Sequence, residues 1–279
     1  MRRRGGPGAT SRAVLAVAVV LATVAGCGSG GDADGASDPA GMRAETTAPT
    51  TAPPTTRALR SFTVLGAGDI LLHNLVIQSG RANAGGQGYD FDPNFAEVRD
   101  RISAADLAIC HQETPISADN TQLTVPRTLS FNAPREIATA LANAGFDACD
   151  TASNHTYDRG AKGVKETLDV LDEAGIGHAG GSRSQEEAEN PRIYDVKGVK
   201  VGHLAFSYTI DNSGGPTTRV PSDVPWLREM LWPAIGVDGM LAQARRIKER
   251  GAEFVVMSVH WGDQYVAKPN ATQRQMAQQ

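Results

Sequence analysis

The sequence predicts an α/β domain built around a largely parallel sheet. Three observations predict it: short apolar runs typical of buried strands, amphipathic helical stretches between those runs, and glycines that end the helices. The folded part is predicted to span residues 61–279. That length is enough for one domain with a sizeable hydrophobic core.

Strands and helices alternate along this predicted domain. The strands are expected at residues 62–65, 106–110, 146–151, 192–196, 199–207 and 254–259, with a glycine-rich loop at 66–69 after the first. The helices are expected at residues 95–102, 135–145, 160–174 and 240–250. The helix at 160–174 has the clearest pattern, because Val164, Leu168 and Leu171 share one face and Gly175 follows as a stop signal.

Residues 1–26 have the composition of a signal peptide. Four arginines and no acidic residue precede Cys27, and the apolar run that begins at Ala13 is too short to cross a hydrocarbon core of roughly 30 Å. The segment Val24-Ala25-Gly26-Cys27 resembles a lipoprotein box, in which the cysteine is acylated and becomes the first residue. We therefore expect a lipid on Cys27 that holds the protein on the outer face of the cell membrane. Ordinary secretion with an incidental Cys27 is the alternative.

Residues 27–60 are predicted to form a disordered tether, since they are mostly Gly, Ala, Ser, Asp, Thr and Pro and have too little apolar surface to fold. Removing the four arginines of the signal peptide from a chain of net charge −4 leaves −8. This negative charge argues against nucleic acid as a partner.

Two cysteines remain in the predicted domain, in a compartment that permits disulfides. Cys110 and Cys149 both lie late in predicted strands. A bridge between them is one interpretation, and two separately buried thiols is the interpretation that we favour.

Polar side chains follow four of the predicted strands at their carboxyl ends, which is the edge where open α/β sheets bind ligands. They are Asp69, His111, Glu113, Asn154, His155 and His260. Each has a structural explanation when taken alone, because an aspartate can cap a helix, an asparagine can bridge a turn and a single histidine is commonly structural. Their shared placement favours a mixed oxygen and nitrogen site for one or two divalent ions.

These residues lie in motifs that resemble a known family. The motifs are Gly68-Asp69-Ile70, Glu113-Thr114-Pro115, the stretch from Ser153 to Gly160, and Val259-His260-Trp261-Gly262-Asp263. From Phe62 to Gln279 the chain resembles the CapA-type proteins of capsule and poly-γ-glutamate synthesis, whose domain is similar to calcineurin-like metallophosphoesterases. The resemblance implies a layered sandwich. It also implies that the sandwich is incomplete, since the family continues beyond the His-Trp-Gly strand into a further strand and a histidine ligand loop.

The resemblance assigns expected roles at the matching positions. Asp69 would bind one metal, and Glu113 would stand where the family has a bridging carboxylate. Asn154 and His260 would complete the second metal site. His155 would donate a proton to the leaving group. His111 stands where the family more often has Asn, so it is either an added ligand or a hydrogen-bond donor to one. The metal is expected to be Mn, Fe, Zn or Mg.

Three other histidines receive weaker expectations. His73 would face the same metal only if the segment after Asp69 were helical, and His178 and His203 are expected to be structural or exposed.

Two functions of different class follow. The first is a metal-dependent, phosphoesterase-like enzyme of capsule or poly-γ-glutamate metabolism. The second is a non-catalytic, lipid-anchored scaffold that binds an envelope polymer or membrane-bound synthesis proteins. Retention of divalent metal separates the two, because resemblance to a hydrolase fold alone does not establish hydrolysis.

Overall fold

The computed structural model describes residues 60–127, 129–212 and 214–279. The predicted signal peptide, Cys27 and nearly all of the rest of the tether lie outside these residues. Within the described part, no helix has the length and apolar character needed to span a membrane.

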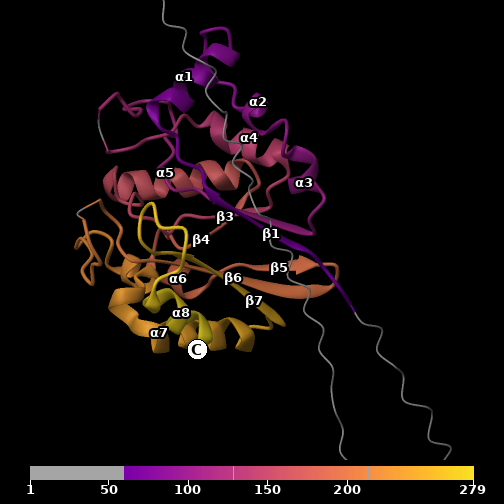
Figure 1. Cartoon of the computed structure of the whole chain (residues 1–279), viewed down its shortest axis with the longest axis vertical. Coiled ribbons are helices and arrows are strands. Elements are labelled where there is room, and N and C mark those ends of the chain that lie inside the picture. The colour runs from indigo at the N-terminus through magenta and orange to yellow at the C-terminus, as the bar shows by residue number, and fades with distance from the viewer. Residues whose placement is uncertain (1–59, 128, 213) are drawn as a thin grey trace, which may run out of the picture. The chain divides into compact units, whose positions relative to one another are not determined.

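The described strands form two sheets (Figure 1). The first has the order β1-β2-β3-β4 and is parallel throughout; its strands are β1 (Val64–Asp69), β2 (Leu107–His111), β3 (Ala148–Asp150) and β4 (Gly177–Ala179). The second has the order β5-β6-β7; its strands are β5 (Ile193–Val196), β6 (Val199–Ser207) and β7 (Phe254–His260). β5 is antiparallel to β6, and β6 is parallel to β7. The parallel sheet is confirmed, and the second sheet agrees with the layered sandwich that the family resemblance implies.

Helices cover the outer face of each sheet (Figure 1). Those on the first sheet are α1 (Asn74–Asn83), α2 (Asp92–Phe95), α3 (Arg99–Ser103), α4 (Glu136–Ala144) and α5 (Gly160–Glu173). The remaining helices are α6 (Gln185–Glu189), the 3-10 helix η1 (Pro225–Met230), α7 (Trp232–Glu249) and α8 (Ala271–Gln278). Buried side chains of α7 share a core cluster with Leu204 and Phe206 of β6. The layers therefore run helix, sheet, sheet, helix.

The alternation of side chains along β2 explains why its two faces are both covered. Leu107 and Ile109 belong to the core between the sheets, together with Val201 of β6. Ala108 and Cys110 point the other way, into the core under α4 and α5. A strand buried on both faces appears in the sequence as a continuous apolar run, and this is what made β2 predictable.

β1 is longer than its sequence pattern indicated. Residues 66–69 were expected to form a loop, but the strand continues through them, with Gly66 opposite Ile109 and Asp69 opposite His111. Pairing with the buried β2 overrides the low strand propensity of the glycines, and a register shift between Gly66 and Asp69 absorbs the irregularity.

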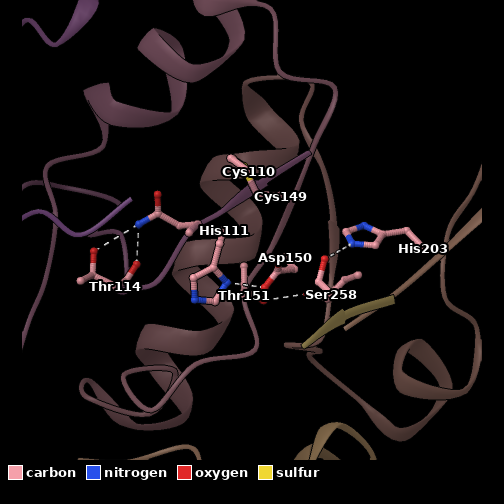
Figure 2. The surroundings of a disulfide bond; sticks show 10 residues. Cys110, His111, Thr114, Cys149, Asp150, Thr151, His203 and Ser258 are labelled. Carbon is pink, nitrogen blue, oxygen red and sulfur yellow. Dashed lines mark hydrogen bonds and ion pairs between the residues drawn. A yellow bond between two sulfur atoms is a disulfide. The ribbon is translucent and has the colours of Figure 1, made fainter. Parts of the chain in front are cut away.

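The prediction of two separate thiols was wrong. Cys110 and Cys149 face each other in the register of β2 and β3, with their Cα atoms 4.3 Å apart, and form a disulfide (Figure 2). The sequence placed each cysteine near a strand end but did not reveal that the two strands are neighbours in matching register.

Candidate metal centre

Three predicted ligands meet at one point where the two sheets end. Asp69, His111 and His260 each offer a donor atom within 4.8 Å of the others'. They are the last residues of β1, β2 and β7, so parallel strands bring together side chains that are far apart in the sequence. Asp69 is exposed, His111 is buried and His260 is half-buried, which leaves the group open to solvent on the Asp69 side.

The donor atoms of this group lie slightly farther apart than the ligands of one bound ion. Oδ1 of Asp69 lies 3.9 Å from Nε2 of His111. Outside the group, Oδ1 of Asn154 accepts a hydrogen bond from Nε2 of His260 at 3.1 Å. Donors bound at about 2.1 Å to one metal are roughly 3 to 3.5 Å apart. The rings of His111 and His260 stack with centroids 4.9 Å apart. The donor set of one carboxylate, two imidazoles and an adjacent amide oxygen therefore fits a divalent transition metal.

The two histidines respond in opposite ways to their surroundings. Burial disfavours the charged form of His111, but the Asp150 carboxylate outweighs this and, with Asp69 and Glu113, raises the pKa of His111. Burial and the neighbouring His111 lower the pKa of His260 to about 4. His260 is therefore neutral at physiological pH, which is the form in which imidazole binds metal.

His155, the predicted proton donor, is held beside this group by a local hydrogen bond. Its Nδ1 lies 2.8 Å from Oδ2 of Asp158, and both side chains are buried. The rings of His155 and Phe131 meet almost at a right angle, with centroids 4.7 Å apart. Asp158 also accepts a hydrogen bond from the backbone N–H of Phe131 at 2.6 Å, so the pair is fixed from two sides.

Glu113, the predicted bridging carboxylate, is not a member of the three-residue donor group. Its side chain is buried, and its Oε2 has no hydrogen-bond partner in the described structure. Burial and the Asp69 carboxylate raise the pKa of Glu113, while His111 and His155 act in the opposite direction. Glu113 therefore interacts electrostatically with the charged groups of the site, but unlike Asp69 it does not belong to the donor group.

The other histidines lie apart from the donor group. His73 precedes α1 as its N-cap residue, and its ring lies 5.6 Å from that of Phe131. His178 is buried near Asp172, and burial lowers its pKa. His203 is buried and its Nε2 lies 3.0 Å from the hydroxyl of Ser258, as expected of a structural residue.

Sequence reasoning missed three side chains of the site. Asp150 ends β3 and bonds to His111, Asp158 orients His155, and Tyr208 follows β6 and stacks on His260 with centroids 5.8 Å apart. The strand-end rule that found Asp69 would also have found Asp150 and Tyr208, whose strands were both predicted.

Comparison with known proteins places this arrangement in context. The profile of the family described as "Bacterial capsule synthesis protein PGA_cap" matches residues 63–279. The capsule biosynthesis protein CapA of Bacillus anthracis is 26% identical over 191 residues, which is 68% of this chain and 45% of that protein. The PGA biosynthesis protein CapA of Bacillus subtilis is 25% identical over 187 residues, covering 67% of this chain and 47% of that protein. The chain thus spans about half the length of these curated relatives.

A solved structure of a mutant tryptophan synthase α-subunit of Pyrococcus furiosus can be aligned with this protein. The alignment covers 71% of this chain and 88% of the α-subunit chain. Its identity is 11% and its TM-score is 0.28, so it supports no inference.

Proposed function

Because this chain belongs to the family of bacterial capsule synthesis proteins described as PGA_cap, we propose that it serves capsule polymer synthesis through a divalent-metal site. The curated relatives are described as capsule or PGA biosynthesis proteins, and poly-γ-glutamate is the polymer that we propose here. The proposed chemistry is metal-dependent hydrolysis of the phosphoesterase type.

One observation carries the metal site: Asp69, His111 and His260 converge with their donor atoms within 4.8 Å of one another. Nε2 of His111 is buried and lacks a hydrogen-bond partner among the described residues. An unsatisfied buried polar atom costs about 1–3 kcal/mol, and a bound cation would remove that cost. Asp69, His111 and His260 would hold the ion, with the oxygen of Asn154 as the next donor.

A bound divalent ion supplies Lewis acidity and lowers the pKa of a bound water. The remaining chemistry falls to side chains of this chain. His155 would carry a proton on Nε2 toward the leaving oxygen, because Asp158 accepts the hydrogen of Nδ1 and holds the ring in place. Phe131 packs against that ring at nearly a right angle and limits its rotation.

The proposed location is the outer face of the cell membrane, with a lipid on Cys27. This proposal rests on the arginines and apolar run before Val24-Ala25-Gly26-Cys27. Fractionation of cells that express Cys27→Ser tests it. We expect the variant to leave the membrane fraction, and a variant that still sediments with membranes after a salt wash would contradict the anchor.

Metal content after purification tests the site. The full chain should retain divalent metal in stoichiometric amount after dialysis against metal-free buffer, measured by mass spectrometry of the elements. Asp69→Ala should lose it. Asp195→Ala is a matched control, because the Asp195 side chain is 55% exposed, similar to 57% for Asp69, and lies in β5 outside the donor group.

Each outcome of that experiment decides between the two functions. Metal retained by the wild type and the control but lost from Asp69→Ala supports the enzyme. A correctly folded wild type that retains no metal, even after incubation with Mn²⁺ or Zn²⁺, would leave the non-catalytic scaffold as the better description.

A further inference from the structure

Asp150 and His111 form a buried pair at the carboxyl edge of the first sheet. They are the last residues of β3 and β2 and stand opposite each other in the strand register. Oδ1 of Asp150 is hydrogen-bonded to Nδ1 of His111. Figure 2 shows this bond beside the Cys110–Cys149 disulfide, which joins the same two strands one register position earlier.

This bond determines which nitrogen of His111 carries the hydrogen. An ionised carboxylate only accepts hydrogen bonds, so Nδ1 must be the donor, and in the neutral ring Nε2 then has a free lone pair. Nε2 is buried, lacks a hydrogen-bond partner among the described residues and lies 3.9 Å from Oδ1 of Asp69. The ring of His260 is stacked alongside. The lone pair therefore faces the candidate metal position.

We propose that Asp150 is a positioning residue that fixes His111 in the tautomer and ring orientation of a metal ligand. This inference rests on the proposed metal site and adds a residue that acts on it only through His111. Asp150 is itself outside the donor group formed by Asp69, His111 and His260. Carboxylates that accept the N–H of the ring nitrogen not bound to metal commonly change metal affinity 10- to 100-fold.

The disulfide holds the Asp150–His111 pair in register. Cys110 and Cys149 hold β2 and β3 together at the position next to the pair, and both cysteines are fully buried. The backbone thus keeps the carboxylate and the imidazole opposite each other before any metal binds, so the ring orientation belongs to the folded chain itself.

The tautomer can be read in the metal-free protein. Nitrogen chemical shifts of the His111 ring, recorded on the full chain at alkaline pH where the ring is neutral, should show a protonated Nδ1 and an unprotonated Nε2. Asp150→Ala should give a mixture of tautomers. A wild-type ring protonated on Nε2 would overturn the proposal whether or not the protein binds metal.

Metal affinity then tests the consequence. Asp150→Asn should weaken Zn²⁺ or Mn²⁺ binding about 10- to 100-fold in competition with a chelating dye, although no ligand is removed. Asp147→Asn is the matched control: Asp147 precedes β3 and also bridges to β2, accepting the N–H of Ala108 at 2.7 Å, but at the other end of the strands. The control should bind metal as tightly as the wild type.

A double-mutant cycle shows whether Asp150 acts through His111. In a His111→Ala background, Asp150→Asn should cause no further loss of affinity. An equal loss in both backgrounds, or an Asp147→Asn control that loses as much as Asp150→Asn, would overturn the positioning role. Absence of metal binding by the wild type would refute the proposed metal site, and the tautomer measurement would still decide the orientation of His111.

Discussion

Two histidine–carboxylate pairs lie at the same edge of the first sheet, and they are built differently. His155 and Asp158 are three residues apart and meet within one turn. His111 and Asp150 are 39 residues apart and meet because β2 and β3 are paired in register. The first pair is a local motif, whereas the second exists only in the folded protein.

The surroundings of each ring separate their roles. Nε2 of His111 lies 3.9 Å from Oδ1 of Asp69, and the ring stacks on His260. The ring of His155 instead packs against the aromatic ring of Phe131. If the proposed function is correct, the same hydrogen bond to a carboxylate supports a metal ligand in one place and a proton donor in the other, because the groups around the rest of each ring differ.

The largest expected effect distinguishes these roles because it changes catalytic activity and leaves metal affinity nearly unchanged. His155→Ala should lower hydrolysis of a chromogenic phosphoester by the metal-loaded protein about 100- to 10,000-fold, the usual contribution of a general acid. Its metal affinity should stay within about threefold of the wild type, since His155 is outside the donor group. Loss of metal together with activity would show that the two pairs do not have separate roles.

The next effect concerns the disulfide, which lies beside one pair only. Replacing Cys110 and Cys149 together with alanine should lower the free energy of unfolding by about 4 kcal/mol, because the bridge closes a loop with a sequence separation of 39. Urea denaturation measures this, and a reductant should bring the wild type toward the variant. A wild type that is indifferent to reductant and no more stable than the variant would restore the interpretation of two separate thiols.

A smaller effect comes from a third buried histidine that has a hydroxyl partner in place of a carboxylate. Burial lowers the pKa of His203 to about 4, from the usual 6.5. The unfolded chain therefore takes up a proton that the folded chain excludes, and stability present above pH 6.5 is lost as the pH falls toward 4. Over this range the free energy of unfolding falls by about 3 kcal/mol.

Urea titrations at several pH values test this prediction on the wild type and on His203→Asn. The variant is expected to be less stable at neutral pH but to lose less stability on acidification. Parallel pH dependence in the two proteins would show that His203 is not the group responsible.

The same distinction between local and tertiary information explains how much of the fold the sequence predicted. β6 was predicted with its observed bounds, since residues 199–207 form a long apolar strand pattern between clear turns. β4 was missed because it has only three residues, Gly177–Ala179, and is stabilised by pairing with β3. α7 begins at Trp232, earlier than predicted. Its first turns were missed because the helical backbone is interrupted at Gly236, where the two helical parts meet at a kink.

The site follows the same rule. Asp69 and His260 were predicted because each follows an apolar strand, and parallel strands share a carboxyl edge. The partnership of Asp150 with His111 could not be predicted, since it depends on which strands are neighbours and in which register. The disulfide escaped prediction for the same reason.

The proposed function depends on Asp69, His111 and His260 holding one divalent ion. An anomalous difference map from crystals of the full chain grown with Mn²⁺ tests it most directly. We expect a peak within bonding distance of the Asp69 carboxylate, Nε2 of His111 and the His260 ring. If crystals grown at a saturating Mn²⁺ concentration show no peak between these three side chains, or a peak only elsewhere, then these residues do not hold the ion.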